Sequence, residues 1–215
     1  MEREAFLSRV GRASMTAELP SSPAVPAELP DYPPADLVAL FRNRAQAVNA
    51  VVHGPVSRHG APVTIAGIVT GHGARTFVSW DSLPASGVPG ALTAQGLRRL
   101  EFGLTHEDRD LSAFTSLDVG VTGSTAGLAE SGSLVLEHGP GRPRLASLLP
   151  EIHVALIDVD TISTTLAHWA SKNPETAAKT TNLVIITGPS RTGDIEQQLN
   201  LGVHGPRHVH IVLVR

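Results

Sequence analysis

Cysteine is absent from all 215 residues of the chain. Without thiolates the chain cannot hold an iron–sulfur cluster through cysteine, form a disulfide or use a thiol as a nucleophile. If the protein works in a redox pathway, the electrons must therefore travel through another group or another chain.

Long apolar runs and an excess of positive charge are lacking as well. No apolar run approaches the roughly 18 residues of a membrane-spanning helix, and the N-terminus has no apolar signal core. The 17 basic and 20 acidic side chains leave a net charge of −3, and no basic tract stands out. We therefore expect a cytoplasmic protein that binds neither nucleic acid nor membranes.

What the chain does contain is an ordinary globular composition preceded by a proline-rich segment. Hydrophobic residues make up 41% and charged residues 17% of the sequence, which suits one folded domain. Proline, alanine and serine are concentrated in residues 16–34, which is typical of an extended linker. We predict an N-terminal arm over residues 1–35, with a short helix in residues 1–15, and an α/β domain over residues 36–215.

Apolar and β-branched runs alternate with helical patterns along the domain. This alternation predicts a three-layer α/β/α fold with a mainly parallel sheet. The expected strands are residues 76–80, 99–103, 117–121, 133–136, 151–157, 183–186 and 208–214, and the expected helices are residues 36–52, 88–97, 160–171 and 194–201. Residues 62–70 are ambiguous between strand and helix, because their β-branched side chains favour a strand.

The stretch from residue 182 to 206 reads as a buried strand, a glycine loop, a short helix and a second glycine loop. Gly188, Ser190 and Arg191 stand before the predicted helix, where backbone amides, a hydroxyl and a guanidinium can hold a carboxylate or phosphate. In the alternative interpretation, Ser190 or Thr192 only caps the helix and Arg191 is solvated.

Two carboxylates narrow the choice of ligand at this predicted site. Asp194 and Glu196 stand in the first turn of the expected helix, where they would repel a multiply charged anion. Their alternative role is to complement the helix dipole. A small hydroxy acid with one charge and one hydroxyl fits the site better, and both residues are included among its predicted ligand-binding groups.

A second polar corner is predicted in residues 122–132, where the small residues 122–126 are expected to turn the chain into a helical turn. Gly123, Ser124 and Thr125 can form another anion-binding loop, or they are small only for steric reasons. Glu130 precedes the turn at Gly132 and is predicted as a buried acid facing the cleft, acting as a base or hydroxyl acceptor. Alternatively, it accepts amide hydrogen bonds that hold the turn. We expect both polar corners to share one pocket at the sheet rim.

Histidines near the C-terminus raise the question of a proton carrier or a metal. His204 is interpreted as a cleft residue that carries a proton, or as a hydrogen-bonded turn histidine. His208 and His210 share one strand face, but a metal needs a third or fourth ligand that the sequence cannot show, so no metal is predicted. Neither a Gly-x-Gly-x-x-Gly fingerprint nor a Walker-type lysine is present, so NAD or ATP binding is not predicted.

The two polar corners also carry a family resemblance. The chain resembles the lactate utilisation protein C (LutC/YkgG) family, within the wider LUD domain group, from about residue 36 to residue 215. The matching segments are Gly120-Val121-Thr122, Ala129-Glu130-Ser131-Gly132-Ser133, Ser147-Leu148-Leu149-Pro150, Thr187-Gly188-Pro189-Ser190, Asp194-Ile195-Glu196 and Gly202-Val203-His204-Gly205-Pro206. Gly193 departs from the alanine that relatives commonly carry before the predicted helix.

The resemblance implies a fold and a pathway. The fold would be similar to the NagB/RpiA/CoA-transferase-like α/β proteins. The pathway would be the oxidation of L-lactate to pyruvate, with iron–sulfur clusters on partner subunits, no cofactor in this chain and a small carboxylic acid as ligand. Two alternatives remain open: a free-standing cyclo-ligase-like or CoA-transferase-like enzyme with Glu130 or a nearby carboxylate as nucleophile, and a non-catalytic interaction module.

Overall fold

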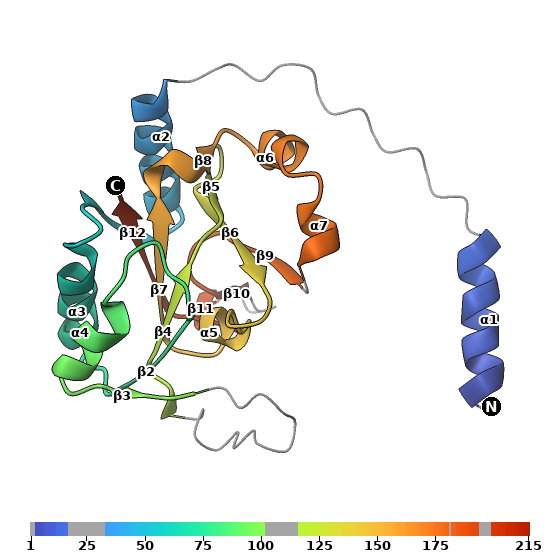
Figure 1. Cartoon of the computed structure of the whole chain (residues 1–215), viewed down its shortest axis with the longest axis horizontal. Helices are drawn as coiled ribbons and strands as arrows, with labels where there is room; N and C mark the ends of the chain where they lie inside the picture. The colour runs from blue at the N-terminus through green and yellow to red at the C-terminus, as the bar shows by residue number, and fades with distance from the viewer. Residues whose placement is uncertain (1–2, 17–32, 102–115, 181, 194–198) are drawn as a thin grey trace.

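The structure is a computed structural model that describes residues 3–16, 33–101, 116–180, 182–193 and 199–215 (Figure 1). Its helices are α1 (Arg3–Thr16), α2 (Pro34–Ala47), α3 (Ala61–Gly71), α4 (Val88–Ala94), α5 (Leu145–Leu148), α6 (Leu166–Lys172) and α7 (Thr176–Lys179). Its strands are β1 (Val51–Val56), β2 (Thr76–Ser79), β3 (Arg98–Arg99), β4 (Val119–Gly123), β5 (Ala126–Leu128), β6 (Ser133–His138), β7 (Ile152–Asp158), β8 (Ile162–Ser163), β9 (Asn182–Ile186), β10 (Arg191–Gly193), β11 (Leu199–Leu201) and β12 (His208–Val214).

A six-stranded parallel sheet forms the centre of the domain, in the order β1-β12-β7-β4-β2-β3. The strands at its centre are short apolar runs, and β7 and β12 are buried along almost their whole length. Continuous apolar runs are expected of parallel strands, because helices or a second sheet cover both faces. The predicted three-layer α/β fold with a mainly parallel sheet is therefore confirmed.

Alternate residues of β7 point into two separate cores. Val154 and Leu156 contact the core under α3 and α4, whereas Ala155 and Ile157 contact the core under α2. This alternation follows from the two-residue period of a strand. In Figure 1, α3 and α4 cover one face of the main sheet, and α2 and the second sheet lie on the other.

The second sheet has four strands in the order β8-β5-β6-β9, and a separate hairpin pairs β10 with β11. Because β9 is an edge strand of this sheet, Leu183 and Ile185 are 36% and 41% exposed. The expectation that residues 183–186 form a strand is confirmed, but the expectation that it is buried on both faces is wrong.

The ambiguous residues 62–70 belong to helix α3. Ala61, Ile65 and Val69 are buried at four-residue intervals and contact the same core. Side chains four residues apart lie on one face of a helix, so this packing outweighs the strand propensity of the β-branched residues. The helices predicted near residues 1–15, 36–52 and 88–97 are present as α1, α2 and α4, although β1 already begins at Val51.

Three local predictions are wrong. The small-residue segment after β4 leads into strand β5 rather than a helical turn. The helix expected from Asp160 begins only at Leu166, where the Thr165 hydroxyl accepts from the His168 amide, and Asp158 caps a preceding 3-10 turn. The helix expected over residues 194–201 is contradicted at its end, where residues 199–201 form strand β11. The rest of that segment, residues 194–198, and the proline-rich residues 17–32 lie outside the described residues.

His153 lies on strand β7 in the centre of the main sheet. Its side chain is fully buried on the face of β7 that the second sheet covers. Its Nε2 is 2.9 Å from the Thr122 hydroxyl on the neighbouring strand β4. Burial, followed by the nearby His138, lowers its pKa from 6.5 to about 3. The ring is therefore neutral in the folded protein at pH values where an unfolded chain would protonate it.

Replacing His153 with glutamine should flatten the loss of stability in acid. Because the pKa of His153 is lower in the folded than in the unfolded protein, its neutral ring contributes fully to the free energy of unfolding above pH 6.5. This contribution is lost as the pH falls toward 3, and the loss at pH 5 is about 2 kcal/mol. Urea unfolding of wild type and His153→Gln at pH 7.5 and pH 5.0 measures it. The exposed His59→Gln variant should behave as wild type. Equal pH dependence in all three proteins would contradict this account.

Candidate functional site

The main sheet has a topological switch point between β2 and β4. After β2 the chain passes through α4 to β3 at one edge of the sheet, whereas after β4 it passes through β5, β6 and α5 to β7 in the opposite direction. Connections that leave two adjacent parallel strands in opposite directions open a crevice at the carboxyl ends of those strands. The candidate site is therefore expected beside Trp80 and Gly123.

A hollow of about 340 Å³ lies at this position. It combines an indole wall, apolar side chains, hydroxyls and one cationic side chain, and its lining residues are Trp80, Ser82, Leu83, Pro84, Gly123, Ser124, Thr125 and Arg142. A side chain at residue 123 would reach into the hollow, since an added Cβ would stand 3.3 Å from Pro84 and 3.7 Å from Trp80. Glycine therefore keeps the space open.

Trp80 is held firmly under the hollow. Its Nε1 donates to the Pro143 carbonyl at 3.2 Å, and its ring meets His138 edge-to-face at 5.4 Å. Burial lowers the pKa of His138; a bond to the Arg142 carbonyl opposes this, and the nearby Arg144 and Arg142 guanidinium groups add to the lowering. The indole wall is thus supported by a neutral imidazole and by the chain segment that carries Arg142.

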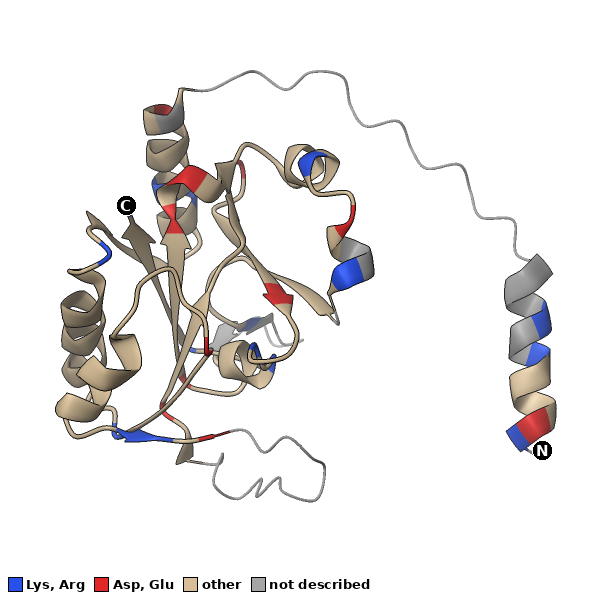
Figure 2. Ribbon diagram, in the orientation of Figure 1, with Lys and Arg blue, Asp and Glu red and all other residues tan. Residues whose placement is uncertain are grey.

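Arg142 supplies the positive charge of the hollow. Its backbone pairs with Gly139 in a tight turn after β6, and the Gly141 carbonyl of the same turn accepts from the Asp81 amide at 3.0 Å. This turn therefore attaches to the loop after β2. Figure 2 shows basic and acidic residues interspersed over the described chain, so the charge at the hollow is local.

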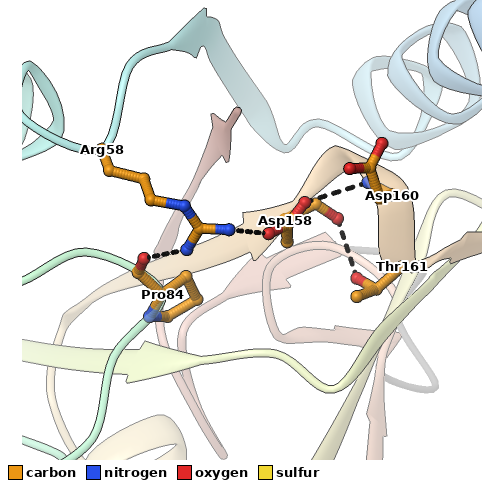
Figure 3. Close-up of polar contacts among 5 residues, drawn as sticks. All are labelled: Arg58, Pro84, Asp158, Asp160 and Thr161. Atoms are coloured by element: carbon orange, nitrogen blue, oxygen red, sulfur yellow. Dashed lines mark hydrogen bonds and ion pairs between the residues drawn. The ribbon is translucent and has the colours of Figure 1, made fainter.

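An ion pair closes the carboxyl edge on the other side of β4. The Arg58 guanidinium, after β1, donates to the Asp158 carboxylate at the end of β7 and to the Pro84 carbonyl (Figure 3). The other oxygen of Asp158 accepts from the Asp160 amide. Arg58 thus ties the loops after β1, β2 and β7 together, which fixes the position of Pro84 beside the hollow.

The predicted loop Gly123–Ser124–Thr125 lies at this edge, but its backbone donors are occupied. The Ser124 amide donates to the Leu156 carbonyl and the Thr125 amide to the Val135 carbonyl. The Ser124 hydroxyl donates to backbone carbonyls at 2.8 and 3.0 Å. A ligand here would therefore meet the Thr125 side chain and the open space above Gly123, and it would not meet a cradle of free amides.

Thr125 also lines a second hollow, of about 390 Å³, between α6 and the segment before it. Thr164 lines the same space, and its buried hydroxyl has no hydrogen-bond partner among the described residues. His168 and Lys172 of α6 face it as well. Two adjacent polar hollows thus meet at the end of β4.

The second predicted corner lies at the opposite end of the parallel strands. The loop with His204 precedes β12, the Ser190 amide donates to the Pro206 carbonyl, and His204 lines a hollow of about 640 Å³ beside the start of β7. The His204 amide lies 3.4 Å from the Ser190 hydroxyl. The expectation of one pocket shared by both corners is therefore wrong for Gly123–Thr125 and His204, because β4 and β7 separate them along their length.

Gly188 and Arg191 contact the carboxyl end of α2 rather than the start of a helix. Gly188 has a φ of +76°, and an added Cβ would collide with the Val48 carbonyl oxygen. Arg191 donates to that same oxygen at 2.9 Å. A cation at this end complements the helix dipole, so both residues have a structural role in docking the 187–191 segment.

Glu130 is exposed, which contradicts the prediction of a buried acid facing the cleft. Its amide donates to the Thr164 carbonyl in the turn between β5 and β6. Just beyond it, a chain of hydroxyls links the turn between β5 and β6 to the end of β9, with 2.7 Å from Ser131 to Ser133 and 2.7 Å from Ser133 to Thr187. Asp194 and Glu196 lie outside the described residues.

Arg142 and Trp80 are the site residues that sequence reasoning missed. Trp80 is the last residue of a predicted strand, and Arg142 sits in a Gly-Pro-Gly-Arg-Pro turn, so both stand where binding side chains are commonly found. Their meeting depends on a contact between the loop after β2 and the turn after β6, which no local pattern reveals.

The fold and the hollow define the class of protein: a three-layer α/β protein with a small polar hollow at the switch point of its sheet. A model of the LUD domain matches residues 38–214. The chain therefore belongs to the LUD domain family.

Several relatives share part of the sequence. Lactate utilization protein C 1 of Bacillus mycoides is 37% identical over 119 residues, which are 53% of this chain and 50% of that protein. Lactate utilization protein C of an Exiguobacterium species is 33% identical over 147 residues, 66% of this chain and 62% of that protein. A Neisseria meningitidis protein named only as uncharacterized is 36% identical over 47% of this chain and 44% of its own length. The matches thus span about half of these relatives.

A solved structure shares the fold. The crystal structure of a DUF162 family protein from Deinococcus radiodurans superimposes with a TM-score of 0.63 over 86% of this chain and all of that chain, at 23% identity. In the described part of this chain, no helix is long and apolar enough to cross a membrane.

Replacing Gly188 with alanine should destabilise the domain by about 3 kcal/mol, since the left-handed backbone conformation and the collision with Val48 both oppose a Cβ. Gly73 is the matched control: its φ is +68°, but an added Cβ would meet nothing within 4 Å. Gly73→Ala should therefore cost only about 1 kcal/mol. Urea denaturation of both variants gives the comparison, and equal losses would argue against docking on α2.

Proposed function

We propose that the protein is a cluster-free component of an L-lactate utilisation system, and that it binds a small 2-hydroxy or 2-keto acid in the hollow between β2 and β4. Membership of the LUD domain family and the names of the two lactate utilization proteins C support the pathway. The hollow at the switch point supports the ligand.

One observation carries the choice of ligand: Arg142 is the cationic side chain in a hollow whose other polar groups include the Ser82 and Thr125 hydroxyls. A guanidinium can bind a carboxylate with two parallel hydrogen bonds. Hydroxyls can donate to or accept from the oxygen on the neighbouring carbon of the acid. A single cation matches a monocarboxylate, and about 340 Å³ matches a small molecule.

The electrons need an acceptor that this chain cannot provide through cysteine. Oxidation of L-lactate to pyruvate breaks the C2–H and O–H bonds and releases two electrons and two protons. Because this chain has no cysteine, it cannot hold a cysteine-ligated cluster itself. We infer that iron–sulfur clusters on a partner subunit take the electrons, and that this chain contributes the acid site.

The edge strand β9 is the surface that we assign to the partner. Leu183 and Ile185 are exposed on it at alternate positions, and among the described strands β9 pairs only with β6. Exposed apolar residues on a strand edge are suited to pairing with another chain. The same observation supports the alternative of a non-catalytic interaction module, in which docking is the whole function.

A free-standing enzyme related to the NagB/RpiA/CoA-transferase-like proteins is the weaker alternative. It needs a nucleophile, and Glu130, the residue suggested for that role, is exposed in a turn. A solvated carboxylate lacks the environment that normally activates such a group.

Replacing Arg142 with glutamine should weaken L-lactate and pyruvate binding about 10- to 100-fold, because a charge-assisted hydrogen bond contributes about 1.5–3 kcal/mol. Isothermal titration calorimetry of the purified full chain with each acid measures it. Arg144→Gln is the matched control, two residues away and exposed on the start of α5, and it should bind as wild type. Unchanged affinity in Arg142→Gln, or no binding by wild type, would remove the acid site from this hollow.

Replacing both Leu183 and Ile185 with aspartate should abolish co-purification of a cysteine-rich partner and its iron from the native host. Val63→Asp is the control, because Val63 is an exposed apolar residue on α3. Iron analysis and mass spectrometry of the captured material decide the outcome. If wild type captures no iron, the partner assignment fails; if the double variant captures as much iron as wild type, β9 is not the interface.

A further inference from the structure

Four histidine rings lie in contact at one edge of the main sheet. His53 belongs to β1, His208 and His210 to β12, and His72 is the residue that ends α3. His208 and His210 point to the face covered by α3, because Val209 and Ile211 point to the opposite core. His72 is exposed, so the cluster is open to solvent at that ring.

His210 is the centre of this histidine cluster. Its Nδ1 is 3.0 Å from Nε2 of His53, and its Nε2 is 2.9 Å from Nε2 of His72. The ring of His208 lies 4.8 Å from the ring of His72. The sequence suggested only the His208–His210 pair on one strand face, and the fold adds His72 from a different element.

The surroundings of three of these rings disfavour the protonated form. Burial, followed by the neighbouring histidines, lowers the pKa of His210 to about 4, and burial, followed by Arg42, lowers that of His53. For His208 burial has the largest effect, His72 and Arg207 also lower the pKa, and Glu151 raises it. Neutral imidazole is the form that binds metal ions.

We propose that the histidine cluster is a binding site for one divalent transition-metal ion, held between Nε2 of His72 and Nε2 of His210 in place of the proton that they share. Two nitrogens 2.9 Å apart, each about 2.05 Å from an ion, subtend an angle of about 90° at it. That angle matches tetragonal Cu²⁺ or Ni²⁺ rather than tetrahedral Zn²⁺.

The remaining rings have distinct roles in this site. As the side chains stand, no group of three or more histidine, aspartate or glutamate residues in the described ranges is arranged to hold an ion. Rotation of the half-buried His208 ring supplies the third nitrogen, and water fills the remaining positions. For Nε2 of His210 to bind the ion, its proton must sit on Nδ1, and Nε2 of His53, 3.0 Å away, is placed to accept that proton.

The site is independent of the proposed acid hollow. His208 and His210 are at the start of β12, whereas the hollow lies at the carboxyl ends of β2 and β4. An ion here would link the end of α3 to β12, and through His53 to the edge strand β1. We therefore expect it to raise the unfolding temperature.

The test uses the untagged full chain, treated with a chelator and then titrated with CuCl₂, NiCl₂ or ZnCl₂ by calorimetry. We expect one equivalent of Cu²⁺ or Ni²⁺ to bind more tightly than Zn²⁺, a raised unfolding temperature, and nitrogen hyperfine lines from at least two imidazoles in the Cu²⁺ paramagnetic resonance spectrum. His72→Ala, which removes an exposed ligand, should weaken Cu²⁺ binding at least tenfold. His210→Gln should do the same.

The exposed His59→Ala variant is the control and should bind as wild type. Circular dichroism establishes that His72→Ala is folded, so this variant decides the question even if His210→Gln does not fold. The proposal is overturned if wild type binds no Cu²⁺ or Ni²⁺, if His72→Ala binds as tightly as wild type, or if His59→Ala loses binding to the same extent. Preference for Zn²⁺ would overturn the tetragonal geometry.

Discussion

Pairing of β7 with parallel neighbours on both sides is the constraint on which the rest of the structure depends. Residues 152–158 pair in register with all seven residues of β12, and residues 152–156 pair with β4. Buried backbone amides and carbonyls need hydrogen-bond partners, and the paired strands provide these partners for one another. Because all these strands run in one direction, every loop that follows a strand meets at one edge, and every loop that precedes one meets at the other.

That constraint separates the two polar corners and assigns each a different role. The carboxyl edge receives Trp80, Thr125 and the turn with Arg142, and the Arg58–Asp158 pair ties its loops together. The amino edge receives His204. Close packing reinforces the division: Gly120 of β4 has no room for a Cβ beside the Ala146 carbonyl of α5, so α5 lies directly against the strand.

The sequence could predict the strands at the centre of the sheet but not what surrounds the site. Residues 151–157 and 208–214 are continuous apolar runs, and this local pattern alone predicts buried strands. The segment 160–171 carries a helical period, yet β8 pairs with β5 and delays the helix to Leu166. The exposure of Glu130 and the position of Arg142 at the hollow both depend on contacts between segments that are distant in the chain. The local sequence pattern does not encode such contacts.

Under the proposed function, the chemistry of the hollow itself explains why a partner is needed. A guanidinium and hydroxyls recognise a carboxylate and an adjacent oxygen, and L-lactate and pyruvate both have these groups. Contacts that hold substrate and product alike do not lower the barrier between them. The step that distinguishes the two acids is the removal of electrons, and a chain without cysteine has no cysteine-ligated cluster to receive them. A binding hollow here and an electron acceptor on another chain are therefore complementary parts of one reaction.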